Sequence, residues 1–81
     1  MTAFLRARCV LGEEHEIATS FFLTEYNRWV KENDGVASAM TSKAMMAAMR
    51  GKGFMAKVAR TKYGNLNSYL GVDVKEEDDG L

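Results

Sequence analysis

The clearest hydrophobic pattern in the chain lies between residues 19 and 33 and has the period of an α-helix. Hydroxyl side chains at its start can cap the first turn, and turn residues at 33–35 end it. Because aromatic rings bury a large apolar area, we expect this stripe to form core rather than a binding site. Its members, at positions i, i+4, i+7 and i+8, are Phe22, Tyr26, Trp29 and Val30.

Before this helix the pattern is shorter and more mixed. Apolar residues at helical spacing predict a first helix over residues 2–11, followed by a polar turn at 12–14. Residues 15–18 alternate polar and apolar side chains, so a brief strand is expected there. Cys9 falls within the first apolar stretch, where we expect a buried small hydrophobe rather than a reactive thiol.

A second, short helix is predicted after a connector of small residues at 36–40. A hydroxyl at position 41 or 42 can cap it, and glycines at 51 and 53 end it, since glycine accepts the positive φ of a helix C-cap. One face carries Met45 and Met49 and is expected to be core. The opposite face is small and basic, and it holds Lys43, Met46, Ala47 and Arg50.

After Gly53 the hydrophobic pattern takes the period of a β-strand. Residues 54–61 and 66–74 alternate in character, and they flank the turn residues 62–65, which predicts a β-hairpin. The second run is expected to place Leu70, Val72 and Val74 on one side. Residues 75–81 are charged and lack apolar anchors, so we expect a flexible acidic tail.

The predicted order is helix, strand, helix, helix, strand, strand, which is that of a winged helix-turn-helix in the α+β class. We therefore expect one domain over residues 1–74, with the strand at 15–18 on the edge of the hairpin and three helices on one face of the sheet. In such a domain the second helix of the pair reads the major groove of DNA, and the hairpin loop is the wing. The hydrophobic fraction of 47% in 81 residues agrees with a small globular fold.

Charge is segregated along the chain although the formal net charge is zero. Residues 37–72 hold six basic side chains and no acidic one, whereas residues 73–81 hold five acidic ones. The basic block coincides with the predicted reading helix and wing, so we expect duplex or forked DNA as the partner. The candidate DNA-binding residues are Ser42, Lys43, Met46, Arg50, Lys52, Lys57, Arg60, Lys62 and Tyr63.

The sequence lacks the signals that mark several other functional classes. No apolar run approaches the ~20 residues of a membrane helix and no signal peptide pattern opens the chain, and with a single cysteine a reducing, cytoplasmic setting is expected. His15 has no cysteine at ligand spacing, and the glycine pair around Lys52 lacks the spacer of a P-loop. We expect a non-catalytic chain without metal or cofactor.

Four groups of residues resemble a known pattern. They are Phe4 near Cys9; the aromatic-rich run from Phe22 to Trp29; the helix residues Met45, Met49, Gly53 and Phe54; and the strand from Tyr69 to Val72. In these groups the chain resembles the C-terminal winged-helix domain of phage, plasmid and poxvirus replicative primase-helicases. The resemblance implies a domain that follows a helicase motor and engages origin or fork DNA, with the rest of such a chain or other replication proteins as partners.

Other functions remain open on the sequence. The methionines between residues 40 and 55 would suit an adaptable surface for a protein partner, if they are exposed. A small freestanding transcription regulator would share the same basic block. The acidic tail could also fold over that block and compete with DNA.

Overall fold

The computed structural model describes residues 2–33 and 39–75. Its elements are α1 (Thr2–Arg8), β1 (Cys9–Ala18), α2 (Thr19–Asn33), α3 (Ser42–Gly51), β2 (Ala56–Thr61) and β3 (Gly64–Val74). The described part is a small α+β fold of three helices and one three-stranded antiparallel sheet, and the predicted order of elements is confirmed. The predictions for 34–38 and 76–81, which belong to the turn, the connector and the acidic tail, lie outside the described residues.

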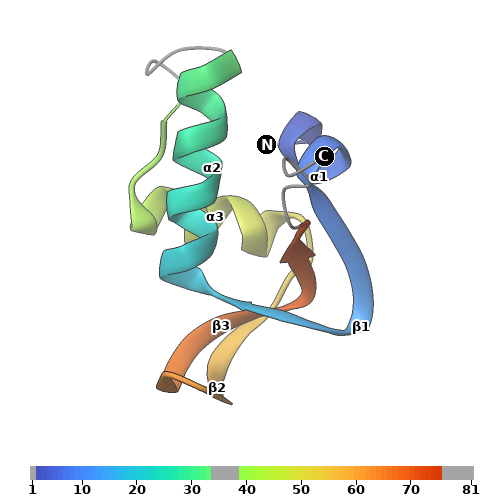
Figure 1. Cartoon of the computed structure of the whole chain (residues 1–81), viewed down its shortest axis with the longest axis vertical. Helices are drawn as coiled ribbons and strands as arrows, with labels where there is room; N and C mark the ends of the chain where they lie inside the picture. The colour runs from blue at the N-terminus through green and yellow to red at the C-terminus, as the bar shows by residue number, and fades with distance from the viewer. Residues whose placement is uncertain (1, 34–38, 76–81) are drawn as a thin grey trace, which may run out of the picture.

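β3 is the central strand of the sheet, with β1 and β2 antiparallel on either side. The hairpin turns through only Lys62 and Tyr63, because Thr61 already pairs with Gly64. The prediction of a turn over residues 62–65 was therefore two residues too long. Gly64 has a φ of +105°, which glycine adopts without steric strain. Figure 1 shows the β2–β3 hairpin extending away from the helices, with its turn at the far end.

The first helix is shorter than predicted, and the first strand begins earlier. α1 ends at Arg8, and residues 9–11 pair with residues 72–74 of β3 instead of continuing the helix. A short apolar run does not distinguish a buried helix from a strand by its period, and here pairing with the central strand satisfies the backbone. Lys75, predicted to begin the tail, donates its N–H to the Arg8 carbonyl at 2.7 Å.

A bulge divides β1 into two paired stretches. Residues 12–15, which include the predicted polar turn, lie opposite Gly71 alone. Gly71 has a φ of +85°, and the alternation of β3 breaks at this point. As a result Tyr69 and Val72 are both buried in one core although they are three residues apart. Of the predicted face of Leu70, Val72 and Val74, Val72 is buried and Val74 packs against the core, whereas Leu70, on the other side of the break at Gly71, does not.

Phe4 of α1 lies at the centre of the aromatic core. Its ring centroid is 5.5 Å from that of Phe22, 5.3 Å from that of Tyr26 and 5.6 Å from that of Trp29. Phe22 in turn meets Tyr69 of the central strand at 5.4 Å, nearly edge to face. The predicted aromatic stripe of α2 is therefore core, with Trp29 partly buried at its margin. These rings join α1, α2 and the sheet.

Cys9 is buried, as predicted, although it begins a strand rather than continuing a helix. Burial raises the pKa of its thiol from 9.0 to about 11, and the nearby Asp73 carboxylate acts in the same direction. Because the unfolded chain loses this proton near pH 9 while the folded chain keeps it, stability is expected to fall as pH rises from 9 towards 11.

The same shift predicts slow alkylation of Cys9. At pH 8 the thiolate fraction alone makes reaction with iodoacetamide roughly 100-fold slower in the folded protein than in urea, since the thiolate is the reacting form. A mass-spectrometric time course in both conditions measures the ratio. Equal rates in the two conditions would contradict the burial of this thiol.

Candidate nucleic-acid interface

Polar contacts fix the N-terminal end of α3. Thr41 is the capping residue, and its Oγ1 accepts a hydrogen bond from the Ala44 N–H at 3.1 Å. Just before it, Asn27 of α2 donates to the Met40 carbonyl and accepts from the Met40 N–H, both at 2.9 Å. A side chain that pairs with both backbone groups of one residue sets the direction in which the chain enters α3. The orientation of α3 is thus tied to α2.

The C-terminal end of α3 is fixed by its own backbone. The Phe54 N–H donates to the Met49 carbonyl at 3.0 Å. Gly53, which has a φ of +93°, donates its N–H to the Arg50 carbonyl, also at 3.0 Å. This pair of bonds is a Schellman motif, which needs a residue that tolerates positive φ. Phe54 then packs against the core. The hairpin therefore leaves α3 in a defined direction.

α3 buries one face and exposes the other, as predicted. Met45 and Met49 are fully buried, so these two methionines fill the core rather than form a surface. On the opposite face Ser42, Lys43 and Arg50 are exposed and Met46 is half-buried. A shallow hollow on this face is lined by Ser42, Lys43, Met46, Ala47 and Arg50.

A groove of about 300 Å³ lies between α3 and the hairpin. Met46 and Arg50 line both this groove and the hollow on α3, so the two form one continuous surface. Met55, 71% exposed, stands at its side. The remaining lining residues are Phe54, Ala56, Asn67 and Tyr69.

The strand register sorts the cations of β2 between two faces. Ala56 lies opposite Tyr69, whose ring contacts α2, so Ala56 and, by alternation, Arg60 lie on the helix side of the sheet. Lys57 lies opposite Ser68 and points to the other side. The alternation predicted over residues 54–61 already separates Lys57 from Arg60, and the register confirms that they lie on opposite faces.

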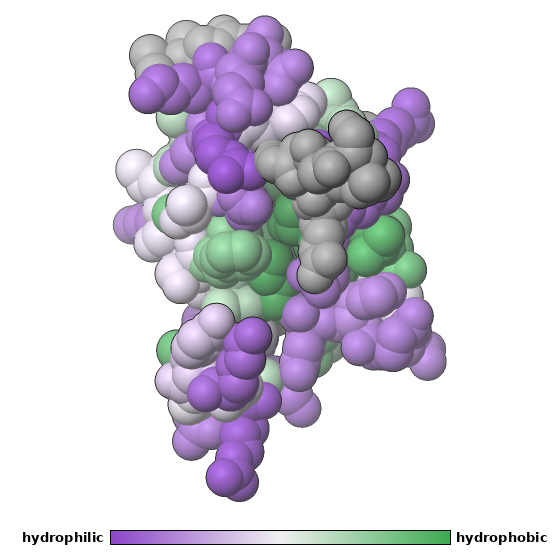
Figure 2. Space-filling model, in the orientation of Figure 1, coloured by the Kyte–Doolittle hydropathy of each residue, from purple (hydrophilic) through white to green (hydrophobic). Residues whose placement is uncertain are grey.

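Lys62 and Tyr63 form the tip of the hairpin. The Thr61 hydroxyl donates to the Gly64 carbonyl at 2.8 Å and accepts from the Tyr63 N–H at 3.0 Å, so one side chain ties the whole turn together. Tyr63 is 77% exposed, and the Lys62 ammonium lies 5.3 Å from its ring centroid. Figure 2 shows this projecting end of the molecule mostly in hydrophilic and near-neutral colours.

Eight of the nine candidate residues are exposed, and Met46 is half-buried. The fold brings together the four on α3, puts Lys52 at the C-cap of that helix and places the others along the hairpin. Phe21, 55% exposed on α2, was not among the candidates. The sequence contains a signal for Phe21, because it precedes the buried Phe22 and so lies about 100° round the helix from it, towards the outside.

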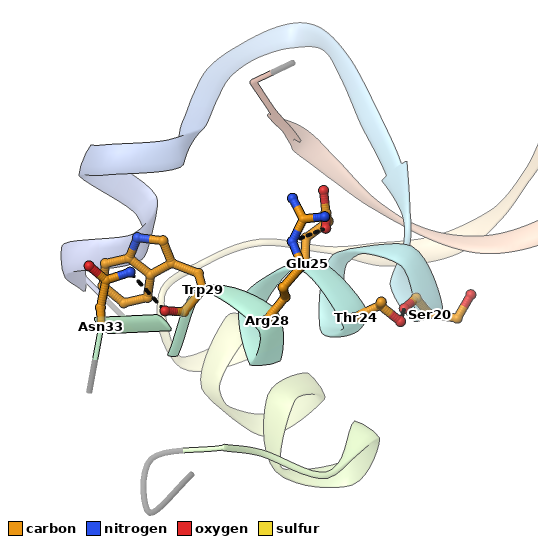
Figure 3. Close-up of polar contacts among 6 residues, drawn as sticks. All are labelled: Ser20, Thr24, Glu25, Arg28, Trp29 and Asn33. Carbon is orange, nitrogen blue, oxygen red and sulfur yellow. Dashed lines mark hydrogen bonds and ion pairs between the residues drawn. The ribbon is translucent and has the colours of Figure 1, made fainter. Parts of the chain in front are cut away.

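The outer face of α2 differs from that of α3, because its polar side chains contact their own helix. Glu25 pairs with Arg28 at 3.6 Å, and Asn33 donates to the Trp29 carbonyl at 2.8 Å (Figure 3). The Thr24 hydroxyl likewise donates to the carbonyl of Ser20 at 3.0 Å. The pair of Glu25 and Arg28 leaves both signs of charge mixed on this helix. An anion would find no uniform positive field there.

Residues 2–33 and 39–75 contain no group of three or more His, Cys, Asp or Glu side chains that could hold a metal ion. His15 lies beside Glu14, with Nε2 3.4 Å from a carboxylate oxygen. None of the helices in this part of the chain has the length and apolar character needed to cross a membrane.

No protein-family model matches the chain, and no curated protein matches it significantly. A functional argument for this chain therefore depends on its residues and their arrangement.

Proposed function

We propose that the chain is a non-catalytic, DNA-binding winged-helix module, in which α3 is the recognition helix and the β2–β3 hairpin is the wing. The observation that carries the proposal is the exposed basic face of α3 beside a projecting hairpin that is also basic. The sheet order β1-β3-β2 fits this architecture, because the strand after the first helix adds to the hairpin. Residues 37–72 contain no carboxylate to repel a phosphate backbone.

The spacing of the cations on α3 suits the major groove. Lys43 and Arg50 are seven residues apart, which is two helical turns and about 10 Å along the axis. The major groove is about 12 Å wide, so the two cations would reach phosphates on its two sides. Met46 and Ala47, which lie between them, would then face base edges, where an apolar contact suits a thymine methyl group.

The wing would bind the DNA backbone that flanks the groove occupied by α3. Arg60 lies on the helix side of the sheet and Lys62 at the tip, so both would meet phosphates of a duplex lying along α3. Lys57, on the opposite side, would add to the positive electrostatic field of the hairpin without contacting a phosphate directly. Phosphate contacts of this kind set register and affinity, whereas base contacts set sequence preference.

Fluorescence anisotropy with a labelled duplex tests the proposal. About five phosphate contacts predict a slope near −4.5 for log K against log[salt], which is a loss of roughly 500-fold between 50 and 200 mM salt. Absence of binding at about 50 mM salt and ~100 μM protein would sink the proposal, because non-specific binding alone should appear there.

We also propose that the module belongs to a replicative primase-helicase of the phage, plasmid and poxvirus kind, acting in the cytoplasm on origin or fork DNA. The support is that residues from each group of the resemblance, among them Phe4, Phe22, Met45 and Tyr69, share one core. A lone module of this size binds weakly, so the motor of such a chain would supply avidity.

One observation favours a competing function in protein binding. The groove between α3 and the hairpin has a largely apolar lining, and Met55 beside it is exposed. Met46 and Met55 are adaptable side chains of the kind used on promiscuous surfaces. This function predicts no salt-sensitive DNA binding in the anisotropy experiment, and so the same measurement separates the two.

A further inference from the structure

We propose that the hairpin tip and the first turn of α2 together bind an unpaired nucleobase, so that the preferred ligand is a duplex carrying a single-stranded extension. This inference rests on the proposed function, because it places the unpaired base next to a duplex held by α3. It gives Tyr63 a role other than holding phosphate, and it assigns a role to Phe21.

Two exposed aromatic rings line one groove. Phe21 and Tyr63 are 55% and 77% exposed, and both border the same groove on the hairpin side of α2, together with Lys62 and Leu66. The other large hydrophobic side chains exposed in the described residues, Leu11, Met55 and Val58, are aliphatic. Every nucleobase has a π-face, so exposed rings beside a cation are the usual elements of single-strand binding.

The tip is held in shape before any ligand arrives. The Thr61 hydroxyl joins the two sides of the turn through its bonds to Gly64 and Tyr63, so the turn needs little further ordering on binding. The Lys62 ammonium, 5.3 Å from the Tyr63 ring centroid, is near enough to meet the phosphate of a nucleotide stacked on that ring. The Tyr63 ring would therefore stack on the base of one nucleotide while the Lys62 ammonium binds its phosphate.

Carboxylates limit the length of strand that this groove can hold. Glu16 and Asp73 also line the groove, and the register places Glu16 opposite Leu70, six residues along β3 from Gly64. That is roughly 20 Å along the strand, beyond a screening length of about 8 Å at physiological salt. The backbone of DNA is repelled at that end and tolerated at the tip. The groove therefore suits one or two nucleotides rather than a long single strand.

The position of the tip explains why the base would be unpaired. β2 is six residues long, about 20 Å, and the hairpin carries its turn away from the helices (Figure 1). A duplex rises about 3.4 Å per base pair, so the tip lies about six base pairs from the point where α3 would sit. A ring at that place has no base face to stack on inside an intact duplex. At the junction with a single-stranded extension such a face is available.

The test compares closed hairpin DNA of about 15 base pairs with the same hairpin carrying a four-nucleotide tail that contains 2-aminopurine. We expect the tailed DNA to bind about 5- to 10-fold more tightly, with the 2-aminopurine emission quenched on stacking. Tyr63→Leu and Phe21→Leu remove a ring but keep apolar bulk. They should abolish the preference and the quenching while leaving affinity for the closed hairpin unchanged. Tyr63→Phe should keep both.

Leu11→Ala, at an exposed position on β1 outside this groove, is the matched control and should behave as wild type. Equal affinity for tailed and closed DNA, or an unchanged preference in Tyr63→Leu, would overturn the inference and leave the proposed function standing. Failure to bind either DNA would overturn both.

Discussion

Phe4→Ala is expected to remove a large part of the free energy of unfolding, about 3–5 kcal/mol. The ring of Phe4 contacts Phe22, Tyr26 and Trp29, so its removal opens a cavity where α1 meets α2. Deleting a buried phenyl group costs about 3–5 kcal/mol. A chain of this length has a free energy of unfolding of only about 4–12 kcal/mol, so the loss is a large part of the total. Urea titration followed by far-UV circular dichroism and by Trp29 fluorescence measures it.

Phe21→Ala is the matched control for this experiment. It removes the same ring from an exposed position on α2, so we expect a change within about 0.5 kcal/mol. Similar midpoints for the two variants would show that Phe4 does not have the central place described above.

Reversing the charge of Lys43 and Arg50 together is expected to weaken duplex binding by about 100-fold or more at low salt. Each reversal deletes one phosphate contact and adds a repulsive carboxylate on the exposed face of α3. The salt slope should become shallower by about 1.8, and affinity at about 50 mM salt should fall by 100-fold or more. Anisotropy at several salt concentrations gives both numbers, and circular dichroism confirms that α3 is intact.

The control carries the same change of net charge elsewhere. Arg6 and Lys31 are exposed on α1 and α2, so Arg6→Glu combined with Lys31→Glu matches the double reversal on α3. If the two double variants lose affinity equally, net charge rather than a site on α3 governs binding.

Helical periodicity was sufficient to predict α2, because its buried stripe repeats over two turns. For α3 the hydroxyl cap and the terminal glycines were needed as well, because its buried face spans about one turn. Periodicity also identified the core side of α3, where Met45 and Met49 are fully buried. It failed for residues 9–11, since three apolar residues have no measurable period and their partner strand lies more than sixty residues away in sequence. Strand pairing between residues so far apart in sequence is a tertiary effect, and local sequence patterns do not predict it.

In the candidate site, too, some features follow from local sequence patterns and others depend on tertiary packing. The exposed face of α3 followed from the sequence alone. Alternation alone separates Lys57 from Arg60, but which of the two lies on the helix side is known only from the pairing of β2 with β3. Nor could the sequence place Phe21 and Tyr63 at one groove, since their proximity depends on how the hairpin packs beside the start of α2.

The position of β2 at the edge of the sheet has a consequence for aggregation. Among the described strands, β2 has a neighbour on one side only, so half of its backbone hydrogen-bonding groups face outward beside the exposed side chain of Val58. Such an edge is a template on which another copy could pair, and positive charge is a common protection against it. Lys57, Arg60 and Lys62 bring like charges together when two such edges approach. Whatever neutralises this hairpin, whether mutation or a bound polyanion, therefore also weakens the barrier to strand pairing between copies.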